Sequence, residues 1–373
     1  MKRRHLIQSI GLGSVTATAA ACARSSKPNG GPPIAADLPR IQWRAIASWP
    51  KALDTIFGGL VSICDRVKEL SDGRFVITPH TAGEIVGALE VMDAVQLGTV
   101  ECGHSSSYYY IGKHRGLAFG TSVPFGLTAQ QQNTWLYAGG GLTAIQAIYR
   151  GFNIINFPAG NTGTQMGGWF KREIKTLNDL QGLKMRIPGL GGEVMARLGV
   201  SVQVLPGSEV FLALDRGTID AAEWVGPYDD AKLGLNRAAN FYYYPGWWEP
   251  GSTLDFFVNL DAWNRLPKAY QAFIQLAAQE ANFAMLAKYE FLNTQGLQKL
   301  IASGTQLRKY PDTVMQKAKS TTDELFADFT ATDANFKAVY EPWQAFQKQV
   351  IDWNQTNEWV FADAITQLQQ SNP

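Results

Sequence analysis

The chain has 373 residues, a length typical of two domains. Hydrophobic residues make up 46% of it and charged residues 17%, so intrinsic disorder is excluded because ample apolar surface can be buried. The 33 Lys and Arg residues against 32 Asp and Glu give a net charge of +1 with no basic block, which argues against a nucleic-acid-binding protein.

The first 21 residues have the pattern of an export signal. Lys2, Arg3 and Arg4 form a positive start, and the stretch that follows is too short and too polar to anchor in a membrane as a helix. The adjacent arginines are typical of a twin-arginine signal, with an ordinary secretory signal as the alternative. Cys22 follows three alanines, which suits either a cleavage site or lipidation of Cys22. We expect a periplasmic protein in which residues 1–39 are the signal and a flexible tether.

Strands and helices then alternate. We expect strands at 40–48, 75–79 and 100–104, with helices at 53–70 and 90–97. A second series starts near 152, and its expected elements are strands at 152–157, 167–170, 184–187, 202–205 and 221–225 and helices at 176–180, 192–198 and 208–216. The alternation predicts α/β sheets covered by helices on both faces. Two such units in one exported chain favour a ligand cleft between two domains.

The last third of the sequence is expected to be helical. After Pro267 the chain runs to Gln295 without Gly or Pro, which predicts one long helix that spans both domains and is a candidate dimer contact. Amphipathic helices are expected at 314–329, 336–350 and 356–368.

The cysteines and histidines suggest no chemistry. Cys64 and Cys102 lie outside any C-x-x-C pair and at no zinc-ligand spacing from a histidine. They are typical of buried thiols, with a Cys64–Cys102 disulfide as the alternative in an exported protein. No zinc site and no Cys or Ser catalytic triad can be argued from them.

Three segments do carry candidate site residues. Arg186 lies in a strand that ends in a Pro-Gly turn, where a guanidinium can pair with a carboxylate, although a surface salt bridge is the alternative. A strand-to-turn segment at 220–230 supplies Glu223, and an aromatic loop at 242–250 supplies Glu249. Paired carboxylates beside aromatic walls suit glycoside hydrolysis or an oxygen cage for a hard cation, and these residues leave both open.

The order of motifs resembles that of the substrate-binding proteins of tripartite ATP-independent periplasmic (TRAP) transporters. Within that family it is most similar to the branch that binds 2-oxo acids or lactate with a metal ion. The resemblance covers nearly everything from residue 40 to about 310, and it rests on the segments 53–59, 160–170, 184–186, 217–220, 223–230 and 244–249. Pro188 stands where this branch of the family is expected to have a small or glycine-like residue. The difference concerns the rim of the pocket and therefore the choice of substrate.

The resemblance implies an α/β, two-domain, periplasmic-binding-protein-like (type II) fold with a ligand cleft between the domains, a long domain-spanning helix and a helical C-terminus. We expect domain 1 at 40–160 plus 252–290 and domain 2 at 161–251 plus 291–373. The substrate contacts that it implies are Arg186, Asn161, Gln165, Trp224 and Tyr108, with Tyr109 as the alternative to Tyr108. The metal ligands that it implies are Gln165, Glu223, the Trp224 carbonyl and Glu249.

Such oxygen donors select hard cations, and we expect Na⁺ or Ca²⁺ ahead of Mg²⁺. A cation between two glutamates also removes their repulsion of an anionic substrate. We therefore expect a binding protein, not an enzyme, that delivers a small monocarboxylate such as pyruvate or lactate to TRAP membrane subunits by hinge closure. A homodimer is left open. The alternatives are the same fold binding a polyol, a sugar acid or an aromatic acid, and an exported carbohydrate-active enzyme built on Glu223 and Glu249.

Overall fold

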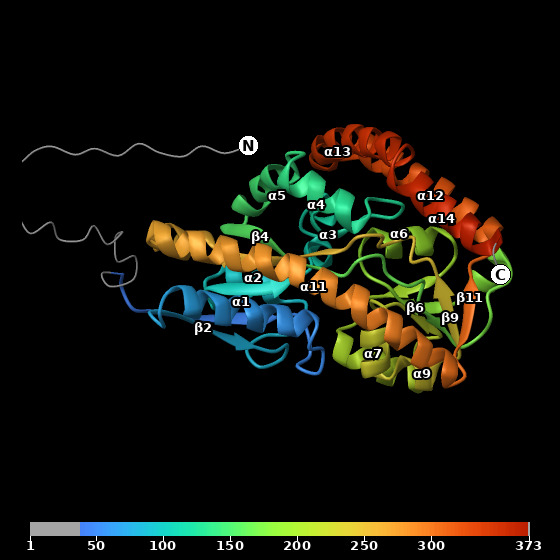
Figure 1. Cartoon of the computed structure of the whole chain (residues 1–373), viewed down its shortest axis with the longest axis horizontal. Helices are drawn as coiled ribbons and strands as arrows, with labels where there is room; N and C mark the ends of the chain where they lie inside the picture. The colour runs from blue at the N-terminus through green and yellow to red at the C-terminus, as the bar shows by residue number, and fades with distance from the viewer. Residues whose placement is uncertain (1–37, 372–373) are drawn as a thin grey trace, which may run out of the picture. The chain divides into compact units, whose positions relative to one another are not determined.

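A computed structural model describes residues 38–371 (Figure 1). They form two β-sheets with helices packed around them, so the predicted α/β class is confirmed. The predicted export signal, Cys22 and most of the tether lie outside the described residues. Within the described part of the chain, no helix is long and apolar enough to cross a bilayer.

The first sheet has five strands in the order β2-β1-β3-β10-β4. Their bounds are β1 Ile41–Ala47, β2 Phe75–His80, β3 Cys102–Ser105, β4 Ile154–Asn161 and β10 Thr253–Asn259. β1 pairs in parallel with β2 and β3, whereas β10 runs antiparallel to β3 and β4. The sequence patterns gave no indication of β10. All seven of its residues are buried, so it lacks the alternation that marks a half-exposed strand.

The second sheet has six strands in the order β11-β9-β5-β8-β6-β7. Their bounds are β5 Trp169–Phe170, β6 Lys184–Arg186, β7 Ser201–Gln203, β8 Ala221–Ala222, β9 Phe241–Tyr244 and β11 Gln306–Lys309. The expectation of a loop at 242–244 is wrong, because these residues form β9. Tyr242 stacks on Trp169 with ring centroids 4.0 Å apart, and Tyr243 packs 4.8 Å from Tyr310, so the aromatic residues build the core of this sheet.

Short helices cover both sheets. Those that follow strands of the first sheet are α1 Ile56–Leu70, α2 Val91–Gln96, α3 Ala118–Thr121, α4 Ala129–Tyr137, α5 Gly141–Arg150 and α10 Leu260–Arg265. Those associated with the second sheet are α6 Gly189–Arg197, α7 Gly207–Asp215, α8 Pro227–Leu233 and α9 Leu235–Ala238. In the described part of the chain, 3₁₀ turns lie at Ser107–Tyr110, Arg115–Leu117 and Leu177–Leu180. The turn at Leu177–Leu180 stands where a short helix was predicted, and α4 and α5 were not predicted.

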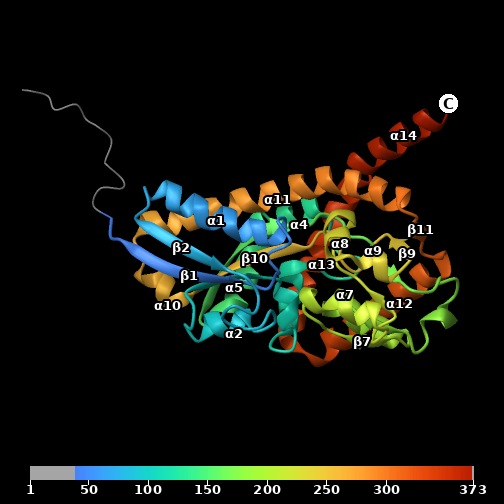
Figure 2. The ribbon, with the colours of Figure 1, turned by 90° about the horizontal axis from the view of Figure 1, so that it is seen from below.

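The helix α11, Lys268–Ala302, has 35 residues and runs along both sheets (Figures 1 and 2). It packs on α1 and β4 beside the first sheet and on α8 beside the second. Gly296 permits the last contact, since a Cβ there would lie 2.9 Å from the Tyr228 backbone nitrogen. The predicted long helix that spans both sheets is therefore confirmed, and it extends beyond its predicted end at 295.

The C-terminus is helical, as predicted, with α12 Asp312–Thr332, α13 Ala334–Asn354 and α14 Glu358–Ser371. α12 packs on α6, whereas α13 packs on α4 and so contacts the first half of the chain. The exact domain boundaries stay a prediction. α14 projects away from the other helices in Figure 2 and leaves Trp359, Phe361 and Leu368 exposed.

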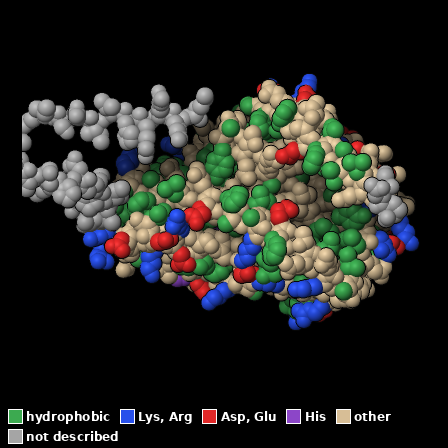
Figure 3. Space-filling view, viewed as in Figure 1, with side chains coloured by type: hydrophobic (Ala, Val, Ile, Leu, Met, Phe, Trp, Pro, Cys, Tyr) green, Lys and Arg blue, Asp and Glu red, His purple; other side chains and the backbone are tan. Residues whose placement is uncertain are grey.

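Two smaller expectations have clear outcomes. Cys64 and Cys102 are both buried free thiols, so the alternative of a disulfide between them is wrong. On the face shown in Figure 3, Lys and Arg side chains are interspersed with Asp and Glu. No broad basic area is visible on that face, in agreement with the charge balance of the sequence.

Candidate functional site

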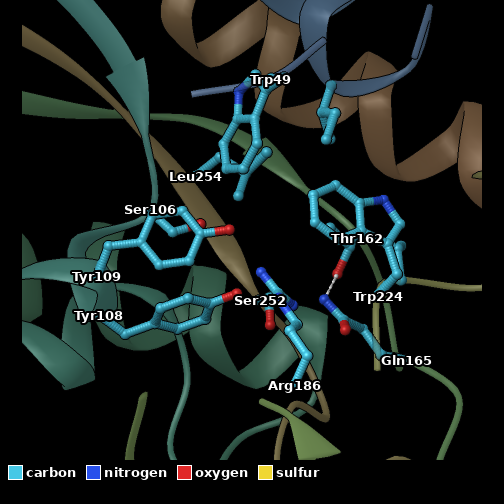
Figure 4. A pocket seen from close by; sticks show the side chains of 12 residues that line it. Trp49, Ser106, Tyr108, Tyr109, Thr162, Gln165, Arg186, Trp224, Ser252 and Leu254 are labelled. Atoms are coloured by element: carbon cyan, nitrogen blue, oxygen red, sulfur yellow. Dashed lines mark hydrogen bonds between the residues drawn. The ribbon is translucent and has the colours of Figure 1, made fainter. Parts of the chain in front are cut away.

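A pocket lies between the two sheets (Figure 4). Its lining residues come from both sheets and from the segments that connect them: Trp49, Ile56, Ser106, Tyr108, Tyr109, Thr162, Gln165, Arg186, Trp224, Val225, Ser252 and Leu254. The structure thus brings together Arg186, Gln165, Trp224 and Tyr108 of the predicted substrate contacts.

The ends of strands place these side chains. β1 ends two residues before Trp49, β3 leads through Ser106 into the 3₁₀ turn with Tyr108 and Tyr109, and Arg186 is the last residue of β6. Ligands of open α/β sheets bind outside the carboxyl ends of the strands, and this pocket follows that rule. Trp49, Thr162 and Ser252 were not predicted as site residues. For Trp49, the signal was its place after a strand and before Pro50.

Arg186 and Glu223 form a buried ion pair in the pocket wall, with both side chains 1% exposed. Arg186 Nε donates to the Leu205 carbonyl at 3.1 Å, and Nη1 donates to the Glu223 carboxylate and, at 3.2 Å, to the Glu223 carbonyl. The guanidinium also lies 5.0 Å from the ring centroid of Trp224. Nη2 has no hydrogen-bond partner, so this edge of the guanidinium can donate to a ligand.

Three oxygen-bearing side chains lie beside this arginine. Gln165 donates from Nε2 to Thr162 Oγ1 at 3.1 Å, which leaves its Oε1 without a partner. Glu223 Oε2 has no partner either, and Glu249 Oε2 accepts from Ser252 Oγ at 2.6 Å. Neither glutamate is among the pocket-lining residues, and each contacts one: Glu223 contacts Arg186, and Glu249 contacts Ser252. Buried unpartnered oxygens of this kind fit a hard cation.

The predicted metal site depends on more than carboxylates. Among residues 38–371, no group of three or more His, Cys, Asp and Glu side chains could hold a metal ion. The set that the resemblance implies, Gln165, Glu223, Glu249 and the Trp224 carbonyl, has two carboxylates and completes the shell with amide and carbonyl oxygens. This donor set suits Na⁺ or Ca²⁺ and is foreign to zinc.

Burial governs the protonation of the two glutamates. It raises the pKa of Glu223 well above its usual value, and the nearby Arg186 opposes that rise. Burial also raises the pKa of Glu249 to about 7, against the opposing hydrogen bond from Ser252 and the charge of Arg186. Two negative charges at this depth are costly with a single arginine beside them. A bound cation would lower that cost, so the electrostatics also fit a metal.

Asn161 differs from the other predicted substrate contacts. It is buried but does not line the pocket, and its Oδ1 accepts from the Gly163 backbone nitrogen at 2.9 Å. Its Nδ2 donates to Thr253 Oγ1 at 3.2 Å. Asn161 thus fixes the turn that carries Gln165, where Gly163 has a φ of 71°. A direct contact between Asn161 and the substrate stays a prediction.

An apolar cleft adjoins the pocket on the side of the two tyrosines. It is lined by Tyr108, Tyr109, Ile111, Ile187, Pro188, Gly189, Gly192, Glu193, Ala196, Val202 and Val204. Pro188, the position that departs from the expected glycine-like residue, is buried and lines this adjoining cleft. Gly189 has a φ of 65°, which favours glycine, and a Cβ there would approach the Tyr108 ring to 3.3 Å, a tight contact.

Known proteins share this sequence and this architecture. Residues 46–333 match the family model described as bacterial extracellular solute-binding protein, family 7. The chain is 59% identical over 358 residues, 96% of its length and 97% of the relative's, to a protein of Nostoc sp. (strain PCC 7120) named monocarboxylate 2-oxoacid-binding periplasmic protein.

Two solved structures of TRAP solute-binding proteins are also similar. One, from Bordetella bronchiseptica, is 43% identical with a TM-score of 0.88, and the match covers 90% of this chain and 100% of that one. It is described as a mixed-occupancy dimer with copurified calcium and picolinate in its active site. The other, from Pseudoalteromonas atlantica with bound sodium and pyruvate, is 38% identical with a TM-score of 0.84, covering 87% of this chain and 99% of that one.

Proposed function

The chain belongs to family 7 of the bacterial extracellular solute-binding proteins, among the solute-binding proteins of TRAP transporters, and we propose that it captures a small monocarboxylate 2-oxo acid in the pocket around Arg186. The observation that carries the proposal is the unpartnered Nη2 of a buried arginine that lines this pocket. A carboxylate can accept a charge-assisted hydrogen bond from this free nitrogen, and the 2-oxo acid and pyruvate named for two relatives carry such a group.

We further propose that a hard cation binds beside the acid. Gln165 Oε1, Glu223 Oε2, the Glu249 carboxylate and the Trp224 carbonyl would hold it, and the ion would supply positive charge for an anionic ligand. Calcium and sodium, present in the Bordetella and Pseudoalteromonas structures, are both compatible with these oxygens. Arg186 holds the acid at its carboxylate. The hydroxyls of Tyr108 and Tyr109, whose pKa values burial raises, remain protonated donors that point into the pocket.

Capture would proceed by closure of the cleft. Arg186, Trp224 and Val225 reach the pocket from the second sheet, and Trp49 and Tyr108 reach it from the first. A ligand that contacts both sets stabilises the closed arrangement, because it loses the contacts with one set when the cleft opens.

The protein would act in the periplasm and pass its ligand to the membrane subunits of a TRAP transporter. We propose that the precursor is exported through its Arg3-Arg4 signal. A homodimer is supported by the Bordetella relative, which is described as a dimer, and by the exposed apolar side chains of α14. Sedimentation equilibrium of the mature protein would show a monomer if this part of the proposal is wrong.

Isothermal titration calorimetry tests the binding function directly. The panel should hold pyruvate, a longer 2-oxo acid, lactate, picolinate, glucuronate and a polyol, each with calcium or sodium present. We expect one molecule of a 2-oxo acid per chain and far weaker binding of the sugar acid and the polyol. Tight binding confined to glucuronate or the polyol would overturn the proposal in favour of the alternative ligands. Protein purified without added ligand and analysed by native mass spectrometry would show any acid and ion that it retains.

A further inference from the structure

Two adjacent buried carboxylates at the start of α8 face different parts of the molecule. Asp230 is bound entirely from the side of the second sheet: Trp169 Nε1 donates to it at 2.9 Å and the Tyr242 hydroxyl at 2.7 Å. The backbone nitrogens of Val225 and Gly226 also donate to Asp230, at 3.1 and 3.0 Å. Asp230 thus fixes the segment that carries Trp224 and Val225 into the pocket.

Asp229 faces the other way. Thr55 is the residue immediately before α1, and its hydroxyl lies 2.7 Å from both carboxylate oxygens of Asp229. The Tyr289 hydroxyl of α11 donates to the same carboxylate at 2.6 Å. Asp229 is 0% exposed and Thr55 2% exposed, so the contact is shielded from water. α1 packs on β2 of the first sheet, whereas α8, which carries Asp229, lies beside the second sheet. The hydrogen bond between Thr55 and Asp229 therefore joins the two sides of the cleft.

A second contact joins the same two elements one residue away. Asp54 pairs with Lys232 of α8 and, at 2.9 Å, with Lys288 of α11, and it accepts a hydrogen bond from the Tyr228 hydroxyl at 3.2 Å. Partial burial raises the pKa of Asp54, but Lys232 and Lys288 outweigh it and bring the pKa down to about 2. The start of α1 is therefore held to α8 by a buried hydrogen bond and by a partly exposed ion pair.

Both contacts border the ligand pocket. Ile56, the first residue of α1, lines the pocket on the side of the first sheet, and Val225, shortly before α8, lines it on the side of the second. We propose that Thr55–Asp229 and Asp54–Lys232 form a latch between the domains, which breaks when the cleft opens and which sets the fraction of closed protein before the ligand arrives. This inference rests on the proposed capture of a 2-oxo acid by closure. The apparent affinity scales with the fraction of binding-competent protein, so weakening the latch weakens binding without touching the ligand.

Thr55→Val removes the hydroxyl and keeps the shape of the side chain, whereas Thr55→Ser keeps the hydroxyl. Tyr242→Phe is the matched control, because it removes a hydrogen-bond donor to Asp230, and that contact lies entirely on the side of the second sheet. Opening can be followed by electron–electron double resonance between spin labels at Lys68→Cys on α1 and Thr218→Cys beside β8, in a Cys22→Ser chain. Cys64 and Cys102 are buried and are not expected to react with the label.

In ligand-free protein, Thr55→Val should shift the distance distribution away from the closed population and weaken binding of pyruvate roughly tenfold. Thr55→Ser should restore both. Tyr242→Phe should lower the melting temperature and leave the distribution unchanged. Asp54→Asn, at a partly exposed position, gives a second variant that should shift the distribution in the same direction if Thr55→Val fails to fold.

An unchanged distribution in both Thr55→Val and Asp54→Asn would overturn the latch and make these contacts a fixed pivot. The label distances are measured without ligand, so they also separate the two proposals. If wild-type protein binds no 2-oxo acid while Thr55→Val still opens, the proposed function fails and the latch stands.

Discussion

Arg186 and Glu223 neutralise each other inside the pocket wall, yet each keeps one atom, Nη2 and Oε2, without a partner. Buried polar atoms are almost always hydrogen-bonded, so two orphaned atoms on one ion pair point to groups that the ligand-bound protein supplies. A carboxylate suits the free Nη2, and a cation suits the free Oε2. The pair therefore provides the common wall of both proposed subsites.

Arg186→Ala should weaken binding of a 2-oxo acid roughly 30-fold or more, because truncating one side of a buried charge pair costs about 2–5 kcal/mol. Arg186→Lys should also weaken it markedly, since lysine has a single nitrogen and cannot bind the Leu205 carbonyl and Glu223 while it presents a separate nitrogen to the acid. Calorimetry measures both. Arg197→Lys on α6, whose side chain is 37% exposed and pairs with Asp328, is the control and should bind like the wild type. Wild-type affinity in both Arg186 variants would remove this residue from the site.

Cation and acid should bind with positive, reciprocal coupling, because each supplies charge that the other needs. Coupling free energies are typically about 1–3 kcal/mol, so complete removal of calcium and sodium should weaken the acid roughly 5- to 150-fold. The measurement is a titration of the acid in chelated, sodium-free buffer against the same titration with each ion restored. Equal affinity in all three buffers would contradict a cation in the site.

Glu249→Gln keeps the shape of the side chain and deletes one charge, so it should reduce the dependence of acid binding on the cation. The matched control is Glu209→Gln at an exposed position of α7, which should preserve that dependence. An ion dependence unchanged in Glu249→Gln would leave Glu249 out of the cation shell.

Asp255 in β10 makes the stability of the protein depend on pH. Burial raises the pKa of its carboxyl from 3.8 to about 7, although Asn156 and Tyr149 donate hydrogen bonds to it. Between these two values the folded state holds a proton that the unfolded state has lost, so stability falls as the pH rises through that window. Each pKa unit is worth about 1.4 kcal/mol, so the loss is on the order of a few kcal/mol.

Asp255→Asn should flatten the part of the pH profile that this carboxyl causes. Urea unfolding at pH 4.5, 6 and 7.5 measures it, and we expect a clearly smaller fall in the free energy of unfolding for the variant. Asp261→Asn, at an exposed carboxyl on α10, is the control and should follow the wild type. A variant and wild type with parallel profiles would show that Asp255 keeps its charge in the folded protein.

Replacing Arg3 and Arg4 together by lysine should strand the precursor in the cytoplasm, because a twin-arginine signal depends on the pair itself and not on its charge alone. Fractionation followed by immunoblotting shows where the protein accumulates. Normal periplasmic levels of the double variant would favour the general secretory route.

The local sequence determined the elements whose pattern is self-contained. The stripe Leu60, Ile63 and Val67 predicts α1, and the absence of Gly and Pro after Pro267 predicts α11, since helix formation depends on residues within one or two turns of each other. Arg186 was singled out by its place at the end of a strand and Gln165 by motifs that resemble a known family, and the structure places both in the lining of one pocket. Their types also fit the chemistry that we propose for the pocket.

The tertiary structure decided what depends on distant partners. β10 carries no strand alternation, and its place between β3 and β4 arises from pairing with residues about 100 or more positions earlier. Asp229 and Asp230 are chemically identical neighbours, yet one binds Thr55 across the cleft and the other binds Trp169 within its own sheet. Consecutive side chains leave a helix about 100° apart, so their partners depend on which elements pack against each face, and that is settled only when the chain has folded.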